Sequence, residues 1–103
     1  MVEVKVTDKA ISDIELLANY IAKDSVKFAG ITVQNIFEAI NYIVDFPEIG
    51  RIVPELNQKS IREIILGNYR KIYWINSKTK IDVIAIHNSS RKLTKTYLRK
   101  RKK

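Results

Sequence analysis

Valine and charged residues alternate over residues 2–6, so the valines share one face of an extended segment and the charges share the other. A period of two is typical of a half-buried strand. From Ala10 to Ile21 the apolar residues recur instead at spacings of three and four. This period predicts an amphipathic helix, and either Thr7 or Asp8 can cap its first turn.

A second helical pattern follows a short break at Asp24 and Ser25, and its apolar positions run from Ala29 to Val44. Pro47 ends this helix, because its ring cannot continue the helical hydrogen bonds and it disfavours helix at the preceding residue. The break is so short that the two helices should form an antiparallel hairpin.

The second half of the chain has the pattern of a sheet. Gly67-Asn68 is typical of a two-residue hairpin turn between strands. The last apolar segment has almost no polar residue, which predicts a central strand buried on both faces. After a loop at residues 47–60, the three predicted strands are residues 61–66, 69–75 and 81–87.

The resulting order, β-α-α-β-β-β, predicts an α+β fold in which an antiparallel sheet packs against a helical hairpin. No linker or internal repeat divides the chain, so residues 1–103 should form a single domain with a basic tail at residues 91–103. The segment from Ser89 could form a short C-terminal helix with Leu93, Tyr97 and Leu98 on one side.

Charge and composition narrow the range of functions. The net charge of +8 is concentrated in residues 91–103, which hold eight basic and no acidic residues. Such a tail attracts polyanions, although a solvated, frayed terminus has the same composition. The absence of cysteine excludes disulfides and thiolate chemistry. Because no apolar run reaches the ~18–20 residues of a membrane span and the N-terminus has a strand pattern, we expect a cytoplasmic protein.

Three residues are candidates for chemistry. Arg70 lies inside an apolar strand, so its guanidinium must reach the rim of the sheet, pair with a carboxylate such as Glu63, or line an anion site. His87, the only histidine, is either a hydrogen-bonded structural residue or a group that moves protons near neutral pH. Glu55 would form an acid–base pair with His87 if the fold brought the two together.

The sequence lacks the common motifs of cofactor-dependent enzymes. It has no glycine-rich phosphate loop, no paired metal carboxylates and no Ser/His/Asp arrangement. With one histidine and no cysteine, the chain also offers few of the ligands that a zinc site uses. We therefore expect neither a metal ion nor another cofactor.

Four short patterns in a fixed order resemble the RelE/ParE superfamily of small bacterial toxins, and the resemblance covers nearly the whole chain. It implies the RelE/ParE-like fold and a growth-inhibiting toxin of a type II toxin–antitoxin module, blocked by a cognate antitoxin that is usually encoded beside it. The patterns are GR-x-VPEL at residues 50–56, IRE at 61–63, YR-x-x-Y at 69–73 and H-x-x-x-R at 87–91.

The superfamily has two branches, and the resemblance implies a different target for each. RelE-like members cleave messenger RNA on the ribosome without a metal ion, whereas ParE-like members poison DNA gyrase and are not nucleases. We expect the ribonuclease, with gyrase inhibition as the alternative. A third reading needs no catalysis: a basic nucleic-acid-binding module that uses Arg62, Arg70 and the tail.

For the ribonuclease branch, the resemblance implies a catalytic set. Arg70 matches the strand arginine that holds the scissile phosphate, and Arg91 and Tyr97 match a second arginine and a downstream tyrosine. Glu55 and His87 fall close to the positions of the base and the acid. The base would take the proton of a 2′-hydroxyl, which attacks the adjacent phosphorus, and the acid would protonate the leaving 5′-oxygen. The further residues expected to contact RNA are Arg51, Lys59, Arg62, Lys92 and Arg99.

Overall fold

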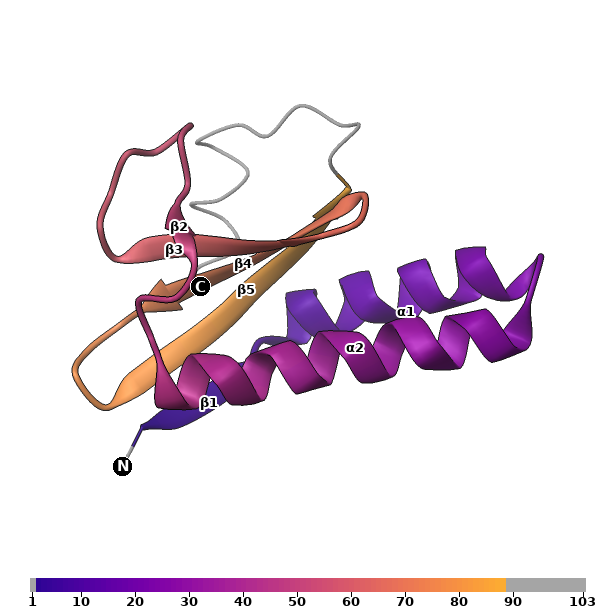
Figure 1. Ribbon diagram of the computed structural model, residues 1–103, viewed down its shortest axis with the longest axis horizontal. Helices are drawn as coiled ribbons and strands as arrows, with labels where there is room; N and C mark the ends of the chain where they lie inside the picture. Colours follow the sequence, from indigo (N-terminus) through magenta and orange to yellow (C-terminus); the bar gives the residue numbers. More distant parts are fainter. Residues whose placement is uncertain (1, 89–103) are drawn as a thin grey trace.

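The computed structural model describes residues 2–88, which form two helices and a five-stranded sheet (Figure 1). The predicted order of elements is confirmed, with one additional short strand after the helices. The predicted C-terminal helix and the basic tail lie outside the described residues. The elements are β1 (Glu3–Val6), α1 (Asp8–Ala22), α2 (Val26–Asp45), β2 (Arg51–Ile52), β3 (Ile61–Leu66), β4 (Tyr69–Ile75) and β5 (Lys80–Asn88).

Side-chain caps fix the starts of both helices. The Thr7 hydroxyl accepts a hydrogen bond from the Ala10 amide, with 3.2 Å between oxygen and nitrogen. The Ser25 hydroxyl does the same for the Phe28 amide at 3.1 Å. Each cap satisfies an amide that the first helical turn leaves without a partner. The helix boundaries therefore follow from local sequence.

The strand order across the sheet is β1-β5-β4-β3-β2, and β5 is a central strand as predicted. Strands β2 to β5 pair in antiparallel fashion, whereas β1 and β5 run parallel. The sheet is thus mixed, which corrects the expectation of a wholly antiparallel sheet. A tight hairpin forces its two strands to be antiparallel, but β1 and β5 are far apart in sequence and no turn sets their relative direction.

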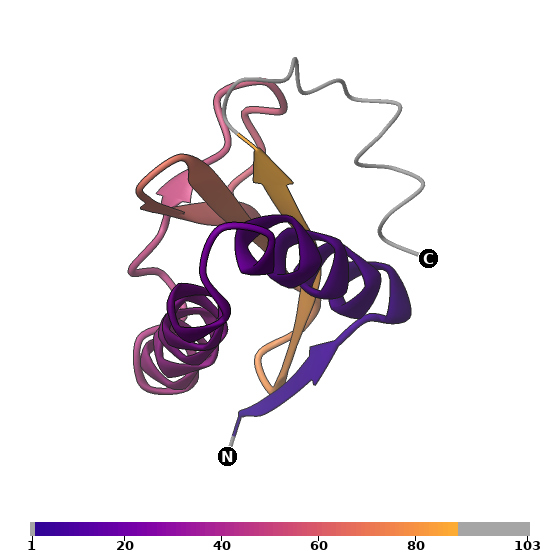
Figure 2. The same ribbon diagram turned by 90° about the vertical axis from the view of Figure 1, so that its right-hand side faces the viewer.

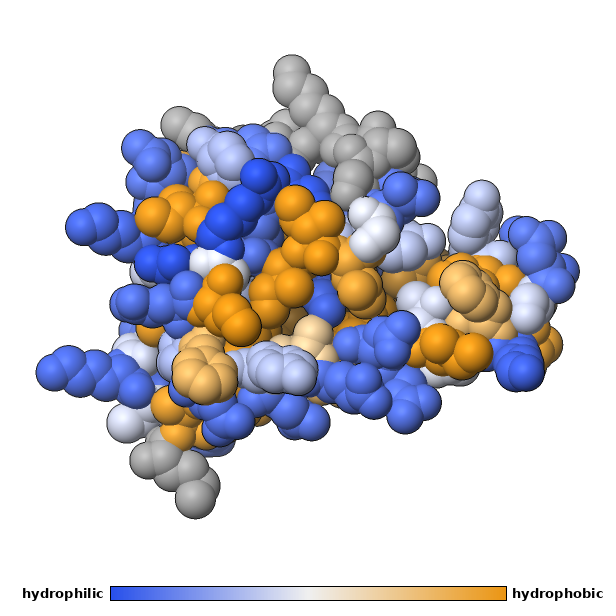
Figure 3. Space-filling model, in the orientation of Figure 1, coloured by the Kyte–Doolittle hydropathy of each residue, from blue (hydrophilic) through white to orange (hydrophobic). Residues whose placement is uncertain are grey.

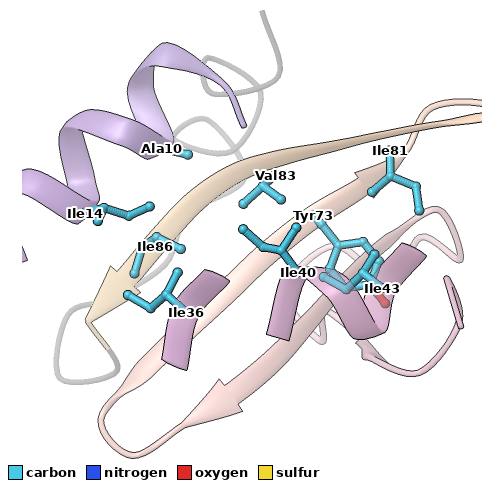
Figure 4. Close-up of a cluster of buried hydrophobic side chains, with 9 residues drawn as sticks. All are labelled: Ala10, Ile14, Ile36, Ile40, Ile43, Tyr73, Ile81, Val83 and Ile86. Carbon is cyan, nitrogen blue, oxygen red and sulfur yellow. The ribbon is translucent and has the colours of Figure 1, made fainter. Parts of the chain in front are cut away.

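Both helices cover the same face of the sheet (Figures 1 and 2). The main hydrophobic core lies between them and the sheet, with side chains from α1, α2, β4 and β5 directed into it (Figure 4). Its buried members are Ala10, Ile14, Ile36, Ile40, Ile43, Tyr73, Ile81, Val83 and Ile86.

A smaller core occupies the opposite face, under the loop that joins β2 to β3. Val53 of that loop packs there with Ile61, Ile72 and the pair Ile84–Ala85. The pair reaches this face because the β4–β5 register shifts after Ile72, so that β5 carries one extra residue. The second core therefore anchors the loop against the helix-free face of the sheet, where the candidate site lies.

Tyr73 and Gly50 connect this loop to the main core. The Gly50 amide donates to the Tyr73 hydroxyl at 3.0 Å, and that hydroxyl donates to the Pro47 carbonyl at 2.6 Å. A Cβ atom at position 50 would lie only 2.7 Å from the Glu63 carbonyl oxygen. Position 50 therefore requires glycine because the β3 backbone approaches it closely.

Lys71 is an anomaly in the main core. It lies on the helix-facing side of β4, paired with Ile64 and Ile86, and only 2% of its surface is exposed. Its Nζ has no hydrogen-bond partner among the residues that the structure describes. Burial lowers the pKa of Lys71 from 10.5 to about 8, because an ammonium group loses its hydration there.

We predict that Lys71→Met stabilises the protein at pH 7. The folded state binds the lysine proton less tightly than the unfolded state, so wild-type stability should rise by roughly 3 kcal/mol as the pH increases from about 8 to 10.5. Below this window the ammonium is present in both states and its full cost applies. Urea unfolding at several pH values measures the effect, and the variant should lose this rise.

Lys5→Met, on the exposed face of β1, is the matched control for loss of one positive charge. It should leave the pH dependence unchanged. Equal or lower stability of Lys71→Met at pH 7 would show that the buried ammonium carries no such cost.

Candidate functional site

Arg70 is the centre of the candidate site. Its side chain lies on the helix-free face of β4, and its guanidinium is bound along two edges. Nε donates to Glu63 Oε1 at 2.5 Å, whereas Nη1 and Nη2 donate to the two carboxylate oxygens of Glu55, each at 2.8 Å. The expectation that Arg70 would pair with Glu63 is therefore confirmed, and Glu55 is a second partner.

Glu63 extends this pairing to a second arginine. Its other carboxylate oxygen, Oε2, accepts from Arg51 Nε at 2.5 Å. The four residues Arg51, Glu63, Arg70 and Glu55 alternate in sign, and we refer to them as the ion-pair chain. Their formal charges sum to zero, so the sheet face carries them without a net charge.

Strand register explains why these side chains meet. Arg51 of β2 lies directly opposite Glu63 of β3, which lies opposite Ile72 of β4. Arg70 is two residues from Ile72 along β4. Its side chain therefore points to the same face as that of Glu63 and is the diagonal neighbour of Glu63. Glu55 joins from the loop, whose residues Val53 and Leu56 pack into the second core on either side of it.

The two carboxylates differ in exposure. The Glu63 side chain is completely buried, whereas one third of the Glu55 side chain is exposed. Hydrogen bonds from Arg70 lower the pKa of Glu55 to about 2, and Glu55 in turn raises the pKa of Arg70. Glu55 is thus ionised at neutral pH and is a weak base while it is bound to Arg70.

His87 lies directly opposite Arg70 in the β4–β5 register and is buried. The structure therefore brings three of the predicted catalytic residues together, namely Arg70, His87 and Glu55, with Glu55 bonded to Arg70. Arg91 and Tyr97, together with Lys92 and Arg99, lie outside the described residues.

The remaining predicted RNA-contacting residues have different surroundings. Arg51 belongs to the ion-pair chain, and more than half of its side chain is exposed. Arg62 donates to the backbone carbonyls of Lys59, Glu48 and Gly50, so it holds the two ends of the loop together. The Lys59 side chain is exposed. The sequence did not reveal Arg51 as a partner of Glu63, because a two-residue strand has too short a pattern to recognise.

An apolar groove lies between α2 and the outer part of β3, and Gly50, Arg51 and Glu63 form part of its lining. Its volume is about 420 Å³, and Ala39, Tyr42, Ile49, Ile64 and Ile65 line most of it. Figure 3 shows apolar surface gathered between α2 and the sheet. Exposed apolar patches of this kind are typical of surfaces that bind other proteins.

Within residues 2–88 no group of His, Asp and Glu side chains is arranged to hold a metal ion. Neither of the helices there is long and apolar enough to cross a bilayer.

The unequal burial of the two carboxylates predicts unequal costs of removing them. Glu63→Gln should destabilise the protein by about 3–5 kcal/mol, because it leaves two arginines beside a neutral buried amide. Glu55→Gln should cost only about 1–2 kcal/mol, because water can partly replace its exposed carboxylate. Urea unfolding at pH 7 measures both, with Glu48→Gln in the adjoining loop as the control. Equal costs for the two variants would contradict the assigned geometry.

The Glu55–Arg70 pair also predicts a pH dependence. Since the pKa of Glu55 falls from its ordinary 4.5 to about 2 on folding, the pair stabilises the fold fully above about pH 5. This contribution is lost as the pH falls towards 2. The stability difference between wild type and Glu55→Gln should therefore shrink over that range, and a constant difference would show that the pair does not form in solution.

Comparison with known proteins places the chain in a family. No curated protein is significantly similar in sequence. Among solved structures, a chain of the "Chromosomal ParDE TA system from P. aeruginosa" shares the fold, with a TM-score of 0.70 and 20% identity over 85% of this chain and 96% of that one. The family model described as "ParE toxin of type II toxin-antitoxin system, parDE" matches residues 4–93. The chain therefore belongs to the ParE family of type II toxin–antitoxin toxins, within the RelE/ParE superfamily.

Proposed function

We propose that this toxin inhibits DNA gyrase and is not a ribonuclease. The observation that carries the proposal is the bond between Arg70 and Glu55. The cation and the base that a ribonuclease would use are bound to each other. Membership of the ParE family supports the same choice, because the ParE-like branch is the one expected to act on gyrase.

The chemical requirements of RNA cleavage explain why this bond matters. A nuclease of this type needs a cation that can meet the developing charge on phosphorus and a base that can accept a proton from a 2′-hydroxyl. Both Nη atoms of Arg70 are already engaged by Glu55. A carboxylate whose pKa is about 2 is also a poor proton acceptor. A toxin that acts by binding gyrase needs neither group to be free.

A ribonuclease is the second candidate, because the register places His87 opposite Arg70 and the loop brings Glu55 to the same guanidinium. In that mechanism Glu55 would have to leave Arg70 before a phosphate could bind there. Arg91 and Tyr97 would then complete the site, and Arg51, Lys59 and Arg62 would contact the RNA.

The partner of this toxin is a cognate antitoxin, which we propose is encoded beside it and acts with it in the cytoplasm. The apolar groove between α2 and β3 is a suitable surface for such a protein. Tyr42 and Ile65, which both line the groove, are each at least half exposed although both are large and apolar. Covering them with a partner would remove this surface from water.

Purified gyrase and purified ribosomes test the proposal directly. The toxin should inhibit supercoiling and increase gyrase-dependent DNA breaks, and it should leave messenger RNA on stalled ribosomes intact. The toxin bound to its antitoxin is the control and should be inactive in both assays. RNA cleavage by the free toxin, with no effect on gyrase, would overturn the proposal in favour of the ribonuclease.

A further inference from the structure

Lys71 carries a buried positive charge that no carboxylate of residues 2–88 pairs with. The residue is 2% exposed, and its Nζ has no hydrogen-bond partner within that range. Burying an ammonium group in this way costs free energy, because the group loses its hydration and gains nothing in return. Any carboxylate that reached Nζ would recover part of this cost, since charge-assisted hydrogen bonds are strong where water is excluded.

The strands around Lys71 supply no such carboxylate. Its direct neighbours across the sheet are two isoleucines, and its neighbours two residues away along β4 are two tyrosines. These four residues are Ile64, Ile86, Tyr69 and Tyr73. Burial is the only cause that lowers the pKa of Lys71, as expected where no acidic group lies close to it.

The helices that cover this face of the sheet supply none either. The buried positions of α1 and α2 hold only alanine, isoleucine and threonine. The acidic side chain that the structure ties to this region is Asp13, whose Oδ2 accepts from the Ile86 amide at 3.1 Å. This bond places Asp13 at the backbone of β5, so the partner that Lys71 lacks must come from outside residues 2–88.

The apolar groove between α2 and β3 lies next to Lys71. Ile64 lines the groove, is only partly buried, and stands directly opposite Lys71 in the β3–β4 register. Side chains paired in this way are adjacent on the same face of a sheet, and the flexible four-carbon stem of lysine is long enough to reach past such a neighbour. The ammonium can therefore meet a group that enters the groove.

The two walls of the groove belong to different parts of the molecule. Helix α2 packs mainly on α1 and β1, whereas β3 packs on β2 and β4. The charged residues of the lining, Arg51 and Glu63, are already bonded to each other. Among the described residues at the groove, Lys71 is thus the cation whose charge is not compensated.

We infer that Lys71 selects the antitoxin: a carboxylate on an apolar segment of the antitoxin enters the groove between α2 and β3 and pairs with the Lys71 ammonium. The inference rests on the proposed placement of the antitoxin in this groove. It adds the chemistry of the bound segment, which must carry an Asp or Glu side chain among apolar residues.

The ammonium would give the groove a specificity that its apolar walls lack. Apolar walls bind many apolar segments in many registers, because the hydrophobic effect has no direction. A segment without a carboxylate leaves the ammonium buried and unpaired, and a shifted segment also leaves its own carboxylate unpaired. Both penalties disfavour wrong partners and wrong registers.

Pairing also changes the protonation of Lys71. In the free toxin its pKa is about 8, and a carboxylate beside the ammonium raises this pKa. Between the two pKa values the free toxin lacks the proton and the complex holds it. Antitoxin binding above about pH 8 should therefore take up a proton and weaken as the pH rises, whereas below pH 8 this group adds no pH dependence.

Calorimetric titration of the toxin with purified cognate antitoxin tests the pairing. At pH 7, Lys71→Met should bind the antitoxin at least ~30-fold more weakly than wild type, because it leaves the antitoxin carboxylate buried and unpaired. At pH 9, in buffers of different ionisation enthalpy, wild type should take up about one proton more than Lys71→Met. Lys5→Met, on the strand at the opposite edge of the sheet, is the matched control and should behave as wild type in both experiments.

The antitoxin provides a second test that needs no change in the toxin. Replacement of each Asp or Glu by Asn or Gln in turn should identify one carboxylate whose loss abolishes the proton uptake. That replacement and Lys71→Met should not be additive: together they should weaken binding at least 10-fold less than the product of their separate effects.

Unchanged affinity or unchanged proton uptake in Lys71→Met would overturn the inference, as would additive effects for every antitoxin carboxylate. Tyr42→Ala, in the wall of the groove, shows how far such a failure extends. If Tyr42→Ala weakens binding, the groove holds the antitoxin and only the role of Lys71 is wrong. If it does not, the placement of the antitoxin is wrong as well. Proton uptake with gyrase in place of the antitoxin, and none with the antitoxin, would assign Lys71 to the other partner and also overturn the inference.

Discussion

The positive charge of a buried guanidinium must be paired with negative charge, and this requirement determines how the polar side chains are arranged on the helix-free face of the sheet. Arg70 is 9% exposed, and an unpaired charge at this position would cost several kcal/mol. Its compensation involves β3 through Glu63, the β2–β3 loop through Glu55, and β2 through Arg51. Alternating charge thus holds these three segments to one another, in addition to the second core under the loop, while the helical hairpin and its core stabilise the other face.

Interactions between residues close in sequence, such as helix caps and a hairpin turn, made most of the fold predictable. The helices have side-chain caps at Thr7 and Ser25, and the Gly67-Asn68 turn, in which Gly67 has φ of 58°, sets the register of β3 and β4. The parallel direction of β1 and the existence of β2 were not predicted. Both depend on contacts between segments distant in sequence, and a strand of two residues has no period to recognise.

The candidate site was predictable only in part, for the same reason. An arginine inside an apolar strand signals a partner or a ligand whatever the fold, and Glu63 was available on the neighbouring strand. The choice of Glu55 for the Nη1–Nη2 edge depends on the path of an irregular loop, which sequence patterns do not determine. The position of His87 opposite Arg70 depends on the extra residue that β5 carries at Ile84. The roles expected of Arg91 and Tyr97 stay predictions, because both residues lie outside the described range.

The ion-pair chain also links stability to function, because the group that compensates Arg70 is the group that blocks its Nη1–Nη2 edge. NMR spectroscopy of the arginine side chains tests this claim most directly. A guanidinium bound on both edges should give a slowly exchanging Nε–H signal and separate signals for its Nη protons, with contacts to Glu55 and Glu63. A single averaged Nη signal for Arg70, like that of an exposed arginine, would contradict the account.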